Sequence, residues 1–270
     1  MVLFDYKKKV DNLIYNYLLT IENEDIREMI DYSLSGGKRL RSVICLYLFD
    51  QFKINRDEIV LGIEFLHNAS LILDDLPCMD NDDYRRNKLS FHKKYGIRKS
   101  YIVTNYLLSE FNKSINSIKC NSLKNYILDK VKLITFGQYY DLYPNITTSN
   151  DINQQIYNNN LKTTPFFVLS FVIPLYIYNN NFKIDVIEKS ALYFSTAFQI
   201  YDDFLDENED MKNNNFNHIK VLGRSETYKL YNNNIEKFNE CIKSFNIDTV
   251  LFKEIINYLN DKLSKYVYDL

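Results

Sequence analysis

Two clusters of aspartates are the residues of this sequence best suited to chemistry. The first lies within residues 74–83 and contains Asp74, Asp75, Asp80, Asp82 and Asp83. The second lies in FQIYDDFLDENED, residues 198–210, and contains Asp202, Asp203 and Asp206. Carboxylates at such spacings repel one another unless a cation lies among them, and oxygen ligands without a matching His or Cys set favour Mg²⁺ over Zn²⁺. Either cluster alone can be a solvated acidic helix end, but the pair predicts a magnesium clamp.

Cationic side chains accompany the acidic ones. The segment GGKRLR, residues 36–41, places Lys38 and Arg41 at an expected helix start, where backbone amides and the helix dipole also attract an anion. Arg85 and Arg86 directly follow the first acidic cluster. A helix-capping turn and simple neutralisation of the aspartates are the alternative readings. Carboxylates, cations and an apolar interior together fit a diphosphate on a hydrocarbon tail.

The elements that position these groups are expected to be helices. Glycine (6) and proline (4) are scarce, and apolar residues recur three and four apart with almost no alternation of period two. We see no repeat and no linker, so the sequence predicts an all-α fold with one domain over residues 1–270. In that fold, helices bearing the aspartates would line an apolar interior.

Composition limits the possible partners and the compartment. A net charge of -2 with 46% hydrophobic residues describes a globular chain and disfavours nucleic acid as a partner. The scattered cysteines and the absence of a signal-peptide pattern predict a cytoplasmic protein. The longest apolar run, residues 165–178, is shorter than the ~20 residues that span a bilayer and contains Pro174, so it predicts a buried, kinked helix.

Several motifs in order give the sequence a resemblance to the trans-isoprenyl diphosphate (polyprenyl) synthases. The matching stretches are GGKRLR at 36–41, LHNASLILDDLPCMDNDDYRR at 66–86, HKKYG at 92–96, GQYYD at 137–141, KTTPFF at 162–167 and FQIYDDFLD at 198–206. The four-residue gap in DDLPCMD resembles the form found in geranylgeranyl and bacterial farnesyl diphosphate synthases.

The resemblance implies an all-helical bundle around a central apolar cavity, usually as a homodimer. It implies Mg²⁺, three ions when diphosphate is bound, held by Asp74, Asp80, Asp202 and Asp206, with Asp75, Asp203 and Lys162 also in the catalytic set. Isopentenyl diphosphate would be bound by Lys38, Arg41, His67 and Arg86. The allylic diphosphate (dimethylallyl, geranyl or farnesyl) would be bound by Arg85, Lys162, Thr163 and Gln199. His67 lies seven residues before Asp74 and therefore on its helix face, although a lone histidine is more often a satisfied, partly buried side chain.

The resemblance also bears on product length. In the family, bulky residues one helical turn before the first aspartate block the growing tail, whereas Ala69 and Ser70 stand at these positions here. Their small side chains predict geranylgeranyl diphosphate, with twenty carbons, over farnesyl diphosphate. Phe65 and Leu66, one turn deeper, are candidates for the floor of the tail-binding site.

One departure from the family pattern leaves two other functions open. The Gly-Lys segment expected after the second aspartate motif is replaced by ENEDMKNNNFNHIK, in which Lys212 and Lys220 are the possible substitutes. A non-catalytic partner subunit that binds prenyl diphosphates is therefore an alternative, although both aspartate motifs are kept. A terpene cyclase of related fold is the third possibility, but such enzymes carry an Asn/Ser/Glu second metal motif and do not need Lys38, Arg41 and His67.

Overall fold

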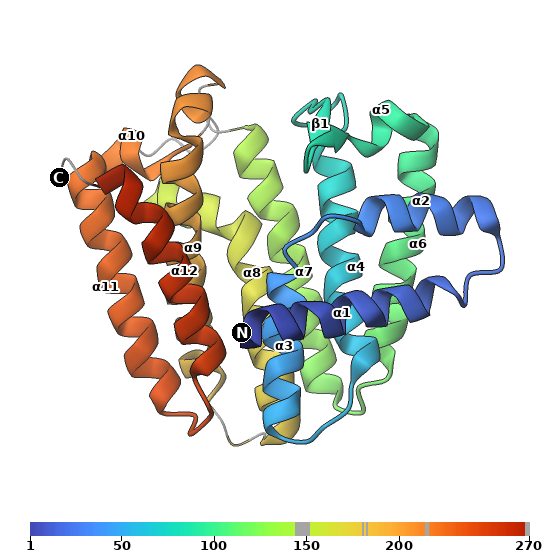
Figure 1. The fold of residues 1–270 in the computed structure, drawn as a ribbon, viewed down its shortest axis with the longest axis horizontal. Helices are drawn as coiled ribbons and strands as arrows, with labels where there is room; N and C mark the ends of the chain where they lie inside the picture. The colour runs from blue at the N-terminus through green and yellow to red at the C-terminus, as the bar shows by residue number, and fades with distance from the viewer. Residues whose placement is uncertain (144–151, 180, 182, 214–215, 268–270) are drawn as a thin grey trace. The chain divides into compact units, whose positions relative to one another are not determined.

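The computed structural model describes residues 1–143, 152–179, 181, 183–213 and 216–267 (Figure 1). Two compact units divide the chain, one formed by residues 4–125 and the other by residues 1–3 and 126–270. Every element in the described ranges is a helix, apart from two strands of two residues each that pair into one hairpin. The predicted all-α fold is therefore confirmed, while the single domain stays a prediction.

The unit of residues 4–125 holds the first aspartate motif. Its elements are α1 (Val2–Leu18), α2 (Glu24–Leu34), α3 (Leu40–Gln51), α4 (Asp57–Asp74), β1 (Tyr84–Arg85), β2 (Lys88–Leu89), α5 (Phe91–Tyr95), α6 (Ile97–Asn116) and the start of α7 (Asn121–Leu142). Asp57 and Glu58 stabilise the first turn of α4 by opposing the helix dipole. Gly62 lets α6 approach α4, since a Cβ atom there would lie 2.0 Å from Ser114 Oγ. Figure 1 shows these two helices side by side.

The hairpin of β1 and β2 carries the arginine pair. Tyr84 pairs with Leu89 and Arg85 with Lys88, so Arg86 and Asn87 form a two-residue turn. Both turn residues have positive φ, 55° and 61°, as a type I′ turn requires. Asn87 suits this conformation, whereas an arginine with positive φ is uncommon.

The unit of residues 1–3 and 126–270 holds the second aspartate motif. Its helices are the remainder of α7, α8 (Ile152–Tyr178), α9 (Ile184–Asn213), α10 (His218–Leu222), α11 (Arg224–Lys243) and α12 (Val250–Val267). Helix α9 packs on both α8 and α11. Buried phenylalanines join the four longer helices after α7, with ring centroids 5.1 to 6.3 Å apart among Phe171, Phe194, Phe238 and Phe252.

Helix α8 extends beyond the apolar run of residues 165–178. It contains both Pro165 and Pro174, and residues 154–178 are long and apolar enough to cross a membrane by length and composition. The expectation that this segment is too short for a bilayer is therefore corrected. Yet 61% of its most apolar window is buried in the protein, as in the core helix of a globular fold. The predicted burial is confirmed, and the cytoplasmic location stays a prediction.

Candidate active site

The first aspartate motif forms where α4 ends and the chain turns back. Asp74 is the last residue of α4, and the backbone N–H of Asp80 donates to the Asp74 carbonyl at 2.9 Å. This bond brings the backbone of Asp80 to the helix end that carries Asp74. Asp74 is partly exposed and Asp80 exposed, so the two predicted ligands lie together at the solvent side of the helix end.

Asp75, the residue after Asp74, is buried. Its Oδ1 atom accepts a hydrogen bond from Arg85 Nε at 2.6 Å and forms an ion pair with Arg85 Nη2 at 2.5 Å. Burial raises the pKa of Asp75, although the hydrogen bond and charge of Arg85 oppose the shift. Burial likewise disfavours the charge of Arg85, but the hydrogen bond with Asp75 and the negative charges of Asp75, Asp74 and Asp82 together outweigh it and raise the pKa of the guanidinium. Asp75 thus holds Arg85 in place beside the motif.

Arg86 is held by a buried polar network that the sequence did not predict. Its Nη1 atom donates to the Ser35 carbonyl at 3.1 Å and to Asn68 Oδ1 at 3.5 Å. The amide nitrogen of Asn68 donates to Glu64 Oε1 at 3.0 Å. Glu64 also accepts from Arg39 Nη1 at 2.8 Å, and Arg39 Nε donates to Asp11 at 2.9 Å.

One sequence signal for this network was available. Glu64 interrupts the apolar run of α4, and a charged residue in such a position requires a buried partner. Arg39, which was not among the predicted site residues, supplies that partner. Arg39 adopts a left-handed conformation, with φ 59°, just before α3. Strained residues of this kind are concentrated at functional sites.

The other residues predicted for isopentenyl diphosphate are only partly brought together. Arg41 Nη1 lies 3.4 Å from His67 Nε2, so this predicted pair is in contact. Burial and the positive charge of Arg41 hold the pKa of His67 well below its usual value. A neutral imidazole at this position hydrogen-bonds without adding charge. Lys38 is exposed on the loop ahead of α3.

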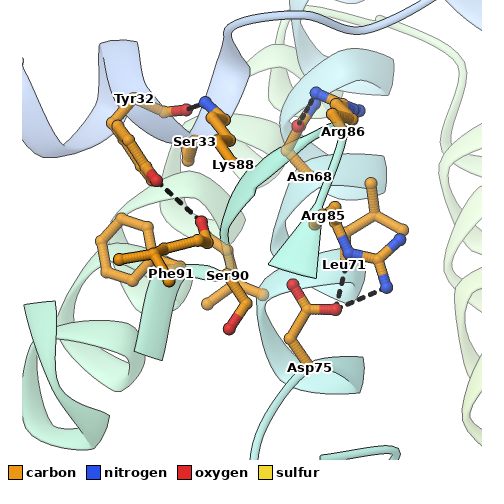
Figure 2. A pocket seen from close by; sticks show the side chains of 12 residues that line it. Tyr32, Ser33, Asn68, Leu71, Asp75, Arg85, Arg86, Lys88, Ser90 and Phe91 are labelled. Carbon is orange, nitrogen blue, oxygen red and sulfur yellow. Dashed lines mark hydrogen bonds and ion pairs between the residues drawn. The ribbon is translucent and has the colours of Figure 1, made fainter. Parts of the chain in front are cut away.

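A pocket lies between the hairpin and α2, α4 and α5 (Figure 2). Arg85, Arg86 and Lys88 line it from the hairpin, while Asn68 and Asp75 line it from α4. Lys88 donates to the Tyr32 carbonyl and to Ser35, and its ammonium lies 3.8 Å from the centroid of the Tyr32 ring. Burial and the charge of Arg86 lower the pKa of Lys88 to about 8. The positive side chains around the pocket suit an anionic group.

The second aspartate motif repeats the pattern of the first. Asp202 and Asp206 are four residues apart on α9 and therefore on one face, partly exposed and exposed respectively. Asp203 is buried, and its Oδ2 atom accepts from both the backbone N–H of His218 at 2.8 Å and His218 Nδ1 at 2.6 Å. Again the second residue of an Asp-Asp pair is bonded inside its own unit.

Lys162 of α8 lies against the GQYYD segment of α7. Its ammonium is 2.8 Å from Asp141 Oδ2. Gly137 permits the approach, because a Cβ atom there would lie 2.3 Å from the backbone nitrogen of Lys162. Thr163 and Gln199 are partly buried, and Gln199 Oε1 has no hydrogen-bond partner among the described residues.

The donor chemistry of both motifs fits magnesium. No three His, Cys, Asp or Glu side chains gather into a metal-sized cluster within the described part of the chain. Mg²⁺ is usually held by one or two carboxylates, with substrate phosphate oxygens and water completing the octahedron. Paired aspartates beside cationic side chains that could bind phosphate oxygens meet that requirement. Asp74 with Asp80, and Asp202 with Asp206, are the residues that would hold it.

Comparison with known proteins supports the same reading. The family model described as polyprenyl synthetase matches residues 23–218. Farnesyl diphosphate synthase of Buchnera aphidicola subsp. Acyrthosiphon pisum is 33% identical over 90% of this chain and 96% of that protein. Farnesyl diphosphate synthase of Micrococcus luteus is 28% identical over 88% of this chain and 89% of that protein. The solved geranyltranstransferase of Thermotoga maritima has the same fold, with a TM-score of 0.85, 24% identity and coverage of 97% of this chain and 100% of the other.

An all-helical fold with two aspartate motifs, the first of them followed directly by two arginines, is typical of a class of enzymes, the isoprenyl diphosphate synthases, which transfer prenyl groups. The chain belongs to the polyprenyl synthetase family.

Proposed function

We propose that the protein is a magnesium-dependent prenyltransferase that condenses isopentenyl diphosphate with an allylic diphosphate into a short all-trans prenyl diphosphate. The allylic substrate would be dimethylallyl, geranyl or farnesyl diphosphate. The observation that carries the proposal is the common design of the two motifs. In each, the second aspartate is buried and bonded, and the two predicted metal ligands remain at the more exposed side of the helix.

The reaction breaks the allylic C–O bond, and the bonding electrons leave with diphosphate. The double bond of isopentenyl diphosphate supplies the electrons of the new C–C bond, and transfer of a proton to the released diphosphate restores a double bond. When bound, Mg²⁺ stabilises the charge that develops on the departing diphosphate. Arg85 and Lys162 would bind the same diphosphate, while Arg86, Arg41 and His67 would orient isopentenyl diphosphate. Apolar walls would exclude water, which would otherwise capture the carbocation.

The proposed product is geranylgeranyl diphosphate. Ala69 is buried on α4 and adds little bulk one turn before the motif. Farnesyl diphosphate is the second candidate, because two relatives carry that activity in their names. The structure gives a physical reason to consider it, since the ring of Phe65 lies one turn below Ala69 with its centroid 4.7 Å from that of Tyr17.

The test is incubation of purified protein with labelled isopentenyl diphosphate, each allylic starter and Mg²⁺, followed by chromatography of the products. We expect elongated prenyl diphosphates that disappear when EDTA removes the metal. Asp202→Ala should lower the rate by about 100-fold or more, as expected for loss of several kcal/mol of charge stabilisation. Asp129→Ala, which removes an exposed aspartate from α7, is the matched control and should leave the rate unchanged.

The same assay separates the alternative functions. Folded protein that elongates no starter would favour the non-catalytic partner subunit, and release of a hydrocarbon from an allylic diphosphate alone would favour a terpene cyclase. The homodimer implied by the family is part of the proposal. Three exposed apolar side chains on α6 are the candidates for the contact between the two copies: Ile97, Tyr101 and Ile102.

A further inference from the structure

The segment that departs from the family pattern is attached to the second aspartate motif by two buried side chains. Asn217 and His218 begin this attachment at the start of α10, and both are 0% exposed. His218 donates to Asp203 Oδ2 through its backbone N–H at 2.8 Å and through Nδ1 at 2.6 Å. Because a carboxylate is an acceptor only, this contact places a proton on Nδ1.

Asn217 reinforces the same connection. Its amide nitrogen donates to the Asp203 carbonyl and to Asp210 Oδ2, both at 2.9 Å, and its Oδ1 accepts from the backbone N–H of Ile219 at 2.9 Å. One side chain thus bonds α9 at two points and also caps α10. Lys212 and Lys220, the two lysines of this segment, are both exposed.

Of these two residues, His218 is the one whose side chain bonds the carboxylate of Asp203. On a helix, the side chains of consecutive residues point about 100° apart around the axis. When the Asp203 carboxylate is held in place, the directions in which Asp202 and Asp206 leave α9 are therefore fixed as well. In the first motif Arg85 makes the corresponding contact with Asp75. His218 Nε2 has no hydrogen-bond partner within the described residues, and the ring packs edge to face on Phe216 with centroids 5.1 Å apart. Its polar function is therefore concentrated at Nδ1.

We propose that His218 is a positioning residue: through Nδ1 it holds Asp203 and thereby fixes the end of α9 on which Asp202 and Asp206 bind Mg²⁺ with diphosphate. The inference rests on the proposed function, and it assigns a role to a segment that lacks the expected lysine. Outer partners that orient metal ligands typically change metal affinity by about 10- to 100-fold when they are removed.

The test measures Mn²⁺ binding by electron paramagnetic resonance in the presence of inorganic diphosphate. His218→Phe removes the donor and keeps a ring, and we expect it to weaken Mn²⁺ binding by about 10- to 100-fold.

His218→Asn places an amide nitrogen near the position of Nδ1 and should restore binding close to that of the unmodified protein. His218→Gln moves the amide one methylene further and should resemble the phenylalanine variant, which keeps the test decisive if His218→Phe does not fold. Thr227→Val, a change at a fully buried residue of α11, is the matched control and should bind as the unmodified protein does.

Two results would overturn the inference: unchanged Mn²⁺ binding by folded His218→Phe or His218→Gln, or weakening by His218→Asn equal to theirs. Failure of the proposed function gives a different result. If the unmodified protein transfers no prenyl group but binds Mn²⁺ with diphosphate in a His218-dependent way, the positioning role stands and the proposed activity falls. If it binds no Mn²⁺ with diphosphate, both are overturned.

Discussion

Asn68 connects two charged side chains of the site, because it lies between Glu64 and Arg86 on the solvent-excluded side of α4. Asn68→Leu keeps the volume but removes the amide. We expect the KM for isopentenyl diphosphate to rise about tenfold, which corresponds to the loss of roughly one hydrogen bond to a charged group. The KM for the allylic substrate should change little, because Arg85 is held separately by Asp75.

Steady-state kinetics with each substrate varied in turn would measure this difference. Ser109→Ala removes an exposed hydroxyl from α6 that bonds only its own helix among the bonds described, and it serves as the control. An equal rise in both KM values would show that Asn68 supports the fold generally and does not position Arg86.

The residue types of the site could be predicted from the sequence, but the direction of each side chain could not. Spacing identified both aspartate pairs, and it placed Asp202 and Asp206 on one face. Which aspartate is buried depends on partners further along the chain, Arg85 for Asp75 and His218 for Asp203. No local pattern reveals such pairings, and for the same reason Arg39 was not distinguished from its basic neighbours.

Gly137 controls how closely two helices of the second unit approach. The atoms that a Cβ at this position would meet belong to the backbone of Leu161 and Lys162, at 2.3 to 2.6 Å, so they cannot rotate away. Gly137→Ala should therefore separate α7 from α8, destabilise the protein by about 1 to 3 kcal/mol and reduce the rate with allylic substrate. Urea unfolding and kinetics measure the two effects.

Gly62 provides the comparison for Gly137. Its obstructing atoms are the side chain of Ser114, with Oγ at 2.0 Å and Cβ at 2.8 Å. Gly62→Ala should also be destabilising, but adding Ser114→Gly should recover much of the loss because the two sites are in contact. Gly137→Ala with stability equal to the unmodified protein would contradict the close helix contact.

We predict that one face of α4 sets the product length, since Phe65 and Ala69 are four residues apart on this helix. Ala69→Tyr should block the tail and shorten the main product by at least one isoprene unit. Phe65→Ala should remove the ring below and lengthen it. Chromatography of dephosphorylated products measures both shifts. An unchanged product distribution in both variants would mean that the tail does not run along this face.

Helices were the most predictable elements, because their apolar spacing and their Pro and Gly punctuation are local. Helix α4, for example, ends at Asp74, shortly before Pro77, since the residue ahead of a proline disfavours helical backbone. The apolar run of residues 165–178 did not give the full extent of α8, because the polar residues ahead of Pro165 also belong to the helix. Both prolines lie within the helix, where its packing on α9 compensates for the lost backbone bonds.

Association of two chains is the property that depends on the whole molecule. Ile97, Tyr101 and Ile102 lie near the start of α6 and are 49%, 46% and 55% exposed. Exposed apolar side chains near the start of one helix favour contact with a copy of the same helix, related by a twofold axis. We therefore predict a dimer of twice 32.3 kDa in sedimentation equilibrium.

Tyr101→Glu should shift the mass toward 32.3 kDa, because it would bury a carboxylate in the contact. Tyr15→Glu, at a tyrosine of α1 that is 62% exposed, is the control and should keep the dimer mass. A dimer that survives Tyr101→Glu would place the contact on another surface, and a monomeric unmodified protein would refute the predicted association.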